Sequence, residues 1–515
     1  MVCCFTNSAV VTGIEAHCIK VEAAIAEGNA AYGVINIVGL PDAAVRESRD
    51  RVVSAIKNSE FSRTSSSVVI NLAPADLRKE GAGFDLPIAL SLLALENTQI
   101  KQDVLQKIMV VGELGLSGEV RPVPGVLNIA IKARKEGIKV LIVPIENARE
   151  AGIVKGLNVY GVGTLRELVA WLQGKNALRR CQTSWEALTG DQLPEDIGDY
   201  RDVKGQELAK RALEVAAAGG HNLLMIGPPG TGKSMLAQRF PSILPPLELD
   251  EAIETSRIHS VAGLLDANRP LITQRPFRAP HHTVSDAGLL GGQNPPHPGE
   301  VSLAHHGVLF LDELPEFKRR TLEVLRQPLE DGQVTISRAG ASYTFPAAFQ
   351  LLAAMNPCPC GYEGSRRRRC RCSGGVKERY RSRLSGPLLD RIDIHVEVPE
   401  LASREMLDLP TGKSSAQMRE AVLKARAVQL DRFAGSKTFF NGKMTPAQIE
   451  KYCRLDEGTR NFLLQAMETL HLSPRAFGRI LKVARTIADM ELSETIQRDH
   501  IREAIQYRSL DRTLW

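Results

Sequence analysis

An eight-residue segment near the middle of the chain limits the possible folds more than any other feature. Gly227-Pro-Pro-Gly-Thr-Gly-Lys233-Ser234 fits the pattern G-x-x-x-x-G-K-[ST]. In such a loop, glycines let backbone N–H groups close around phosphate oxygens, and the following helix adds partial positive charge. The apolar segment 222–226 precedes it as a short buried strand, and a helical pattern follows. Strand, glycine turn and helix in this order predict an α/β module with a parallel sheet that binds ATP.

Each residue of the loop is a candidate ligand of the nucleotide. Lys233 is expected to reach the β- and γ-phosphates, and the Ser234 hydroxyl to ligate Mg²⁺. The predicted binding residues are Gly227, Pro228, Pro229, Gly230, Thr231, Gly232, Lys233 and Ser234.

Two further apolar runs end in polar residues. Asp312 and Glu313 follow the run 308–311, and Asn356 follows the run 349–355. Because ligands of α/β sheets bind at the carboxyl ends of strands, Asp312 is expected to complete the Mg²⁺ shell and Glu313 to polarise the attacking water. Asn356 would orient the water or the γ-phosphate. The plainer alternatives are solvated acids at a strand end and an Asn-Pro turn.

The length of 515 residues allows about three domains. Hydrophobic residues make up 43% and charged residues 24%, and no apolar run approaches the roughly 18 residues of a membrane span. The N-terminus lacks the basic region of a signal peptide, so a cytoplasmic protein without a membrane partner is expected. The predicted divisions are a mixed α/β domain at 1–172, a polar linker at 173–199, the nucleotide-binding domain at 200–399 and a helical lid at 400–515.

Four cysteines lie close together inside an insertion predicted at 358–383. Cys358 and Cys360 form one C-x-C pair, and Cys370 and Cys372 form another. Four thiolates can surround one tetrahedral Zn²⁺, although the usual spacing within a pair is C-x₂₋₄-C. The alternative is a set of reduced cysteines without a metal.

The same insertion is strongly basic. Residues 366–383 contain nine basic residues and one acidic residue, a net charge of +8 against +6 for the whole chain. Such a block either lies solvated or meets a polyanion. Phosphate binding needs a basic stripe of this kind, so Arg366, Arg367, Arg368 and Arg369 are candidate contacts to nucleic acid.

The three nucleotide-site motifs, in this order, resemble those of AAA+ ATPases, and finer features narrow the resemblance. The segment 388–393 is similar to the arginine-finger motif of magnesium chelatase I subunits and minichromosome maintenance helicases, which implies that Arg391 acts on ATP of a neighbouring subunit. Ser473-Pro474-Arg475 resembles their sensor-2 motif. The segment 334–340 resembles their hairpin before sensor 1, which places Arg338 near a central pore as a DNA contact. Segments 275–283 and 298–305 occupy the position of their helix-2 insert.

The N-terminal segment resembles the Lon-type protease domain, an α+β fold of the ribosomal S5 domain 2 type. The resemblance lies in Gly112–Gly125 and Leu141–Pro144. No serine stands in the region 79–85 and no lysine in the region 127–129, where that family has its catalytic pair. A domain without this pair cannot form an acyl-enzyme, so a binding or assembly role is expected.

A Lon-like domain joined to a chelatase-like AAA+ module is similar to the YifB/ComM family over essentially the whole chain. This resemblance implies a hexameric ATPase that acts as a helicase on single-stranded or branched DNA and promotes branch migration in homologous recombination during natural transformation. A chelatase-like ATPase that remodels a protein partner is the alternative. An ATP-dependent protease is disfavoured by the missing serine and lysine.

Overall fold

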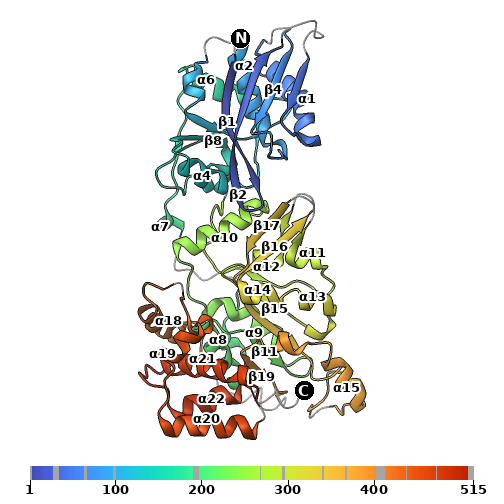
Figure 1. The fold of residues 1–515 in the computed structure, drawn as a ribbon, viewed down its shortest axis with the longest axis vertical. Coiled ribbons are helices and arrows are strands. Elements are labelled where there is room, and N and C mark those ends of the chain that lie inside the picture. Colours follow the sequence, from blue (N-terminus) through green and yellow to red (C-terminus); the bar gives the residue numbers. More distant parts are fainter. Residues whose placement is uncertain are drawn as a thin grey trace.

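Two β-sheets lie one after the other along the long axis of the molecule, and a group of helices occupies the far end (Figure 1). The computed structural model describes residues 3–26, 34–62, 66–96, 100–188, 197–266, 268–292, 296–338, 341–365, 368–401, 412–436, 438–470 and 472–508. The predicted α/β class is confirmed: a parallel sheet follows a mixed N-terminal sheet and precedes a helical C-terminal part.

The N-terminal sheet has eight strands in the order β10-β9-β8-β5-β1-β2-β4-β3. The strands are β1 (Cys3–Thr12), β2 (Glu15–Ile25), β3 (Ile35–Val38), β4 (Val68–Ala73), β5 (Ile108–Val110), β8 (Val140–Pro144), β9 (Asn158–Val162) and β10 (Arg180–Cys181). β1 and β2 form a long antiparallel ribbon whose turn needs Gly13, at φ +63°. The covering helices are α1 (Ala43–Asn58), α2 (Asp85–Glu96), α4 (Val126–Lys135) and α6 (Leu165–Leu172).

The second sheet is parallel throughout, with five strands in the order β12-β15-β18-β11-β19. They are β11 (Leu223–Ile226), β12 (Phe277–Arg278), β15 (Val308–Leu311), β18 (Gln350–Met355) and β19 (Ile394–Glu397). The four residues of β11 and those of β15 are all buried, as expected for strands covered on both faces by helices such as α8 (Glu207–Gly219) and α9 (Lys233–Arg239). Since β15, β18 and β11 are neighbours, the residues that follow them meet at one edge.

A β-hairpin and a helix connect the two sheets. The hairpin consists of β16 (Gln333–Arg338) and β17 (Ala341–Pro346), as predicted, and the turn of the β1–β2 ribbon packs against it through Ile14, which shares a buried cluster with Phe345. Helix α10 (Leu249–Val261) lies against α4, where the N–H of Gly125 donates to the carbonyl of Ser260 at 2.9 Å. The two parts of the molecule that contain these sheets are therefore in direct contact through packed side chains.

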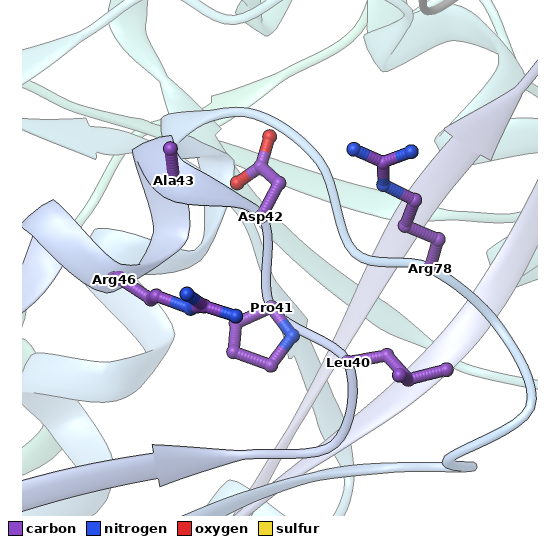
Figure 2. A pocket seen from close by; sticks show the side chains of 6 residues that line it. All are labelled: Leu40, Pro41, Asp42, Ala43, Arg46 and Arg78. Carbon is purple, nitrogen blue, oxygen red and sulfur yellow. The ribbon is translucent and has the colours of Figure 1, made fainter.

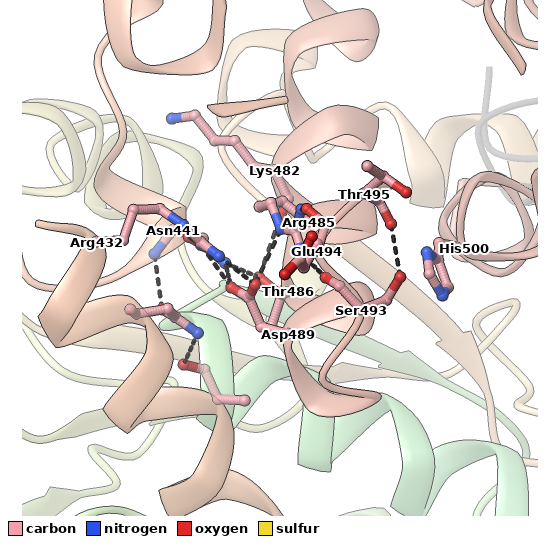
Figure 3. Close-up of polar contacts among 12 residues, drawn as sticks. Arg432, Asn441, Lys482, Arg485, Thr486, Asp489, Ser493, Glu494, Thr495 and His500 are labelled. Atoms are coloured by element: carbon pink, nitrogen blue, oxygen red, sulfur yellow. Dashed lines mark hydrogen bonds and ion pairs between the residues drawn. The ribbon is translucent and has the colours of Figure 1, made fainter. Parts of the chain in front are cut away.

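The C-terminal helices are held by a buried carboxylate (Figure 3). They are α18 (Ser415–Arg432), α19 (Pro446–Tyr452), α20 (Glu457–Thr469), α21 (Pro474–Met490) and α22 (Arg498–Gln506). Asp489 accepts from Arg432 at 2.7 Å, from Arg485 at 2.9 Å and from Asn441 at 2.8 Å. Because a buried charge is tolerated only with such partners, this cluster fixes α18 against α21.

The structure differs from the sequence expectations in two places. The predicted helical lid is interrupted between α19 and α20, because Asp456 caps α20 by accepting from the N–H of Thr459 at 2.9 Å. In the predicted linker, β10 pairs with β9 and a short helix, α7 (Trp185–Leu188), packs near Leu247. Across the described ranges, no helix has the length and apolarity that a membrane crossing requires.

Candidate nucleotide and metal sites

The phosphate loop connects β11 to α9, which begins at Lys233. Gly230 and Gly232 have φ of +79° and +91°, in the region that favours glycine. An added Cβ at Gly227 would lie 2.2 Å from the carbonyl oxygen of Val398, so no side chain fits there. The glycines at these positions are thus required by the local backbone.

The ammonium group of Lys233 lies at the centre of the loop. Its Nζ donates to the carbonyl oxygens of Gly227 at 2.7 Å and Pro228 at 2.9 Å, and to Oδ1 of Asn356 at 3.2 Å. Burial lowers the pKa of Lys233, while the charges of Asp312 and Glu313 oppose that shift. An ammonium held by neutral carbonyls can exchange them for phosphate oxygens, which form stronger charge-assisted bonds.

Ser234 and Asp312 lie side by side, although 78 residues separate them. The Ser234 hydroxyl donates to Oδ2 of Asp312 at 2.6 Å. A hydroxyl and a carboxylate oxygen at the phosphate loop are the donors that Mg²⁺ takes, and the ion keeps its other positions for water and phosphate. The residues present therefore fit a Mg²⁺ ion that arrives with ATP.

Glu313 follows directly with a left-handed backbone, at φ +52°. Its N–H donates to Oδ1 of Asp312 at 2.9 Å, and its half-exposed carboxylate lies 3.4 Å from Nδ1 of His282. With Asn356 bonded to Lys233, the structure brings together the residues predicted to hold phosphate, Mg²⁺ and water.

Arg391 and Arg475 lie elsewhere in the molecule. The guanidinium of Arg391 bonds to Glu330 and to the carbonyl of Pro387, and Arg475 donates to Asp390 at 3.2 Å. Among the described residues, neither arginine has a hydrogen bond or ion pair with the phosphate loop. The two predicted arginines are thus near each other and separate from Lys233 of the same chain.

Two residues in the nucleotide site were not predicted. Gln206 donates to the carbonyls of Thr231 at 3.3 Å and Pro399 at 2.7 Å, so it supports the loop from the side. His282 contacts Glu313 as described above; the adjacent pair with His281 was visible in the sequence but gave no indication of this partner.

A buried polar connection links the parallel sheet to the helical part. His221, which precedes β11, bonds to Thr486 of α21 at 2.8 Å and lies 3.3 Å from Asp393. Burial alone would raise the pKa of Asp393, but the hydrogen bond from His221 and the charges of Arg479 and Lys482 outweigh it and lower that pKa to about 2. Asp393 therefore remains ionised beside the Arg391 segment.

The four cysteines come together as one group. Their Sγ atoms lie at 3.4 Å for Cys358 and Cys360, and at 3.6 Å from each of these to Cys370; Cys372 completes a set within 4.8 Å. Thiolates on a tetrahedral Zn²⁺ at about 2.3 Å lie about 3.8 Å apart. Burial raises the pKa of Cys358, whereas a hydrogen bond from the backbone of Tyr362 lowers that of Cys360. The donors and spacing fit Zn²⁺.

A second group, Glu254, His305 and His306, forms a polar cluster within the fold: Nε2 of His306 bonds to Glu254 at 3.0 Å, and Nε2 of His305 lies 3.4 Å from the same carboxylate. Nδ1 of His305 accepts from the N–H of Ala348 at 3.0 Å, so Nε2 carries the proton and faces Glu254. Hydrogen bonds from His305 and His306 lower the pKa of Glu254. A protonated Nε2 cannot be a metal ligand.

The predicted basic contacts are only partly described. Arg368 and Arg369 are exposed, and Arg368 lies over the ring of Tyr362 at 4.8 Å. Arg366, Arg367 and the side chain of Arg338 lie outside the described part. Other cations of the block are used within the fold: Lys377 and Arg381 pair with Glu363 at 2.9 and 2.7 Å, and Arg383 pairs with Glu316 at 3.0 Å.

The N-terminal part contains a pocket of about 340 Å³ at the start of α1 (Figure 2). Its lining residues are Leu40, Pro41, Asp42, Ala43, Arg46 and Arg78, without a nucleophilic side chain. In the region where a Lon-type serine would stand, Lys79 is buried and donates to the carbonyl of Pro74, and Asp85 accepts from Arg51 at 2.9 Å. Asp85 is thus held in an ion pair with Arg51, and the ammonium group of Lys79 is held by a backbone carbonyl.

Comparisons with known proteins agree with this architecture. Residues 199–406 match the family model for magnesium chelatase, subunit ChlI; residues 21–147 match that for subunit ChlI of Mg-chelatase; and residues 412–508 match that for the ChlI C-terminal part. The region that resembles a Lon-type domain is thus matched by a chelatase model.

Relatives match nearly the whole chain. YifB of Salmonella typhimurium is 46% identical over 506 residues, which cover 98% of this chain and 96% of that protein. Competence protein ComM of Haemophilus influenzae is 44% identical over 504 residues, with the same coverage. The maternal DNA replication licensing factor mcm6 of Xenopus tropicalis is 24% identical over 302 residues, 56% of this chain and 32% of that protein. The chain therefore belongs to the YifB/ComM family of magnesium chelatase-like AAA+ proteins.

Proposed function

We propose that this protein is an ATP-driven DNA motor that acts as a hexamer and moves branch points in recombining DNA during natural transformation. The observation that carries the proposal is the convergence of Lys233, Ser234, Asp312 and Asn356 at the end of three adjacent parallel strands. The family supports an ATPase. The DNA substrate is supported by the name of one relative, a competence protein, and by the partial similarity to a replication licensing factor.

Each residue of the site has a defined task in hydrolysis. The loop backbone and Lys233 bind the phosphates, while Ser234 and Asp312 would hold Mg²⁺, which would neutralise charge on the phosphates. Glu313 accepts a hydrogen bond from the attacking water and polarises it. Asn356, bonded to Lys233, orients the γ-phosphate or that water. Asp312 and Glu313 are adjacent, so the end of β15 positions both the residue that would bind the metal and the residue that activates the water.

Assembly into a ring completes the site. Within the described part of the chain, Arg391 and Arg475 have no hydrogen bond or ion pair with their own phosphate loop, as expected for residues that serve a neighbouring subunit. A guanidinium from the neighbour stabilises charge on the transferring phosphoryl group. Arg391 would leave Glu330 when it reaches that phosphate.

DNA contacts come from the exposed arginines of the cysteine insertion and from the β16–β17 hairpin. Arg368 and Arg369 are exposed beside the cysteine cluster, and they offer charge to phosphates without sequence preference. The match to the chelatase models supports a second candidate, an ATPase that remodels a protein partner.

ATP hydrolysis measured with and without DNA distinguishes the two. We expect single-stranded or forked DNA to stimulate the ATPase, and ATP to drive branch migration of a four-strand junction, with Lys233→Ala as the inactive control. Hydrolysis that ignores every DNA tested, together with no movement of the junction, would refute the DNA motor and favour the remodelling ATPase.

A further inference from the structure

The predicted insertion 358–383, which carries the cysteine cluster, adjoins each of the three segments that carry the nucleotide site. Cys358 follows Asn356 by two residues. Gly361 packs against Pro229 of the phosphate loop. Arg383, beyond the last cysteine, donates to the carbonyl of Pro315 at 3.1 Å and pairs with Glu316, just after Glu313.

The contact between Gly361 and the phosphate loop is close. Gly361 has φ +81°, and its N–H donates to the carbonyl of Cys358 at 2.8 Å, which closes the turn that carries the first two cysteines. A Cβ added there would lie 2.7 Å from Cδ of Pro229 and 3.8 Å from Cγ of Asn356. The backbone of the cysteine turn thus lies directly on the loop and beside the Asn356 amide.

The protein contacts that hold this turn are modest. Glu363 joins it to α15 (Gly374–Arg381) through Lys377 and Arg381, and these side chains are between 23% and 29% exposed. Partly exposed ion pairs contribute little rigidity. A closed site of four thiolates, by contrast, fixes the two turns that supply its ligands.

We propose that Cys358, Cys360, Cys370 and Cys372 bind one Zn²⁺, and that this centre positions Pro229 and Asn356 for ATP hydrolysis. The proposal rests on the ATPase function proposed above. Loss of the metal should then lower kcat more than it lowers the affinity for ATP. The reason is that Lys233, Ser234 and the glycines of the loop are held by β11 and α9. Gly361 is a positioning residue in this scheme, because it acts through the loop.

A pair of glycines in two successive turns, Gly361 and Gly364, provides a matched test. Gly361 and Gly364 have similar φ, +81° and +77°, so alanine strains the backbone equally at both positions; at Gly364 the new Cβ meets nothing within 4 Å. We expect Gly361→Ala to lower kcat by about tenfold or more with a smaller change in KM, since small misplacements in an active site are costly. Gly364→Ala should stay within about twofold of the wild type under the same principle.

Metal content is measured in parallel on the purified full-length protein. The wild type, both glycine variants and Cys181→Ser should contain about one zinc per chain, and Cys372→Ser should lose it. Substitution by Co²⁺ should give the absorption of a tetrahedral cobalt–thiolate site. Chelation of the wild type should lower kcat, and added Zn²⁺ should restore it, which tests the coupling without any variant.

The outcomes separate the two proposals. A wild type that hydrolyses ATP but binds neither Zn²⁺ nor Co²⁺ overturns the metal centre. Equal kcat for Gly361→Ala and Gly364→Ala, or a kcat unchanged by metal removal, overturns the coupling. A zinc-loaded wild type that fails to hydrolyse ATP overturns the proposed ATPase itself, and the coupling with it.

Discussion

Glu313 is held in a conformation that few non-glycine residues adopt. The backbone turns at φ +52° directly after β15, and the N–H of Glu313 bonds to the carboxylate of Asp312. Left-handed backbone at a non-glycine residue costs free energy and persists where the surrounding structure imposes it, often at functional sites. The turn separates the two carboxylates, so that one lies at Ser234 and the other near His282.

Glu313→Gln should retain ATP binding and lose hydrolysis. The amide keeps the size of the side chain but cannot accept a proton, so kcat should fall by about 10² to 10⁴. Nucleotide binding and single-turnover hydrolysis measure the two effects separately. Glu397→Gln, at an exposed acid that ends β19 of the same sheet, is the control. Near wild-type turnover in Glu313→Gln would assign water activation to another residue.

The residues of the nucleotide site could largely be predicted, because Asp312 and Asn356 directly follow buried strands and Lys233 begins the helix after the glycine loop. Adjacency of β11, β15 and β18 then places Lys233 beside Asn356, and Ser234 beside Asp312. His282 and Gln206 could not be predicted, since they lie in loops without periodicity and their partners are set by tertiary packing.

At the scale of elements, the β16–β17 hairpin has two different faces. Val334 and Phe345 are buried, whereas the hydroxyl groups of Thr335 and Thr344 lie 3.0 Å apart on the exposed side. The hairpin itself could be predicted, because the segment 334–340 resembles the hairpin before sensor 1. Its packing against the β1–β2 turn could not, because that contact joins segments more than 300 residues apart.

Arg338→Ala should weaken DNA binding while basal ATPase activity is retained. Arg338 is the last residue of β16, next to the hairpin turn, and a cation there can hold phosphates. Loss of one phosphate contact should reduce the slope of log K against log salt by about one. Titrations with single-stranded DNA at several salt concentrations measure it. Arg49→Ala, at an exposed arginine of α1, is the control. Unchanged affinity and slope would remove the hairpin from the DNA path.

At the scale of the whole molecule, a buried carboxyl group lies where the N-terminal part contacts α10. Glu150 is 6% exposed, and it accepts from Asn147 at 2.8 Å and from Ser260 of α10 at 3.1 Å. Burial raises its pKa from about 4.5 to about 7, although both hydrogen bonds oppose the shift. The protonated form is therefore the one that fits this contact.

Glu150→Gln should remove a pH dependence of stability. Between pH 4.5 and 7 the folded protein retains a proton that the unfolded chain has released, so the free energy of unfolding falls as the pH rises through this range. The loss above pH 7 is about 3 kcal/mol. Thermal unfolding at pH 5 and pH 8.5 should show Glu150→Gln more stable than the wild type only at the higher pH. Glu146→Gln, at an exposed acid of the same segment, should behave as the wild type. Parallel pH curves for all three proteins would contradict the assignment.

The contact between the β1–β2 turn and the hairpin has a mechanical consequence. A Cβ on Gly13 would lie 3.2 Å from Cδ1 of Tyr343, which pairs with Ile336, so the ribbon rests on the middle of the hairpin. The hairpin is therefore supported by the β1–β2 turn, and a force on the hairpin is transmitted along β1 and β2 into the N-terminal sheet. The N-terminal sheet then resists displacement of the hairpin. A substitution that enlarges a residue at the β1–β2 turn is therefore expected to need a compensating change at 343–345.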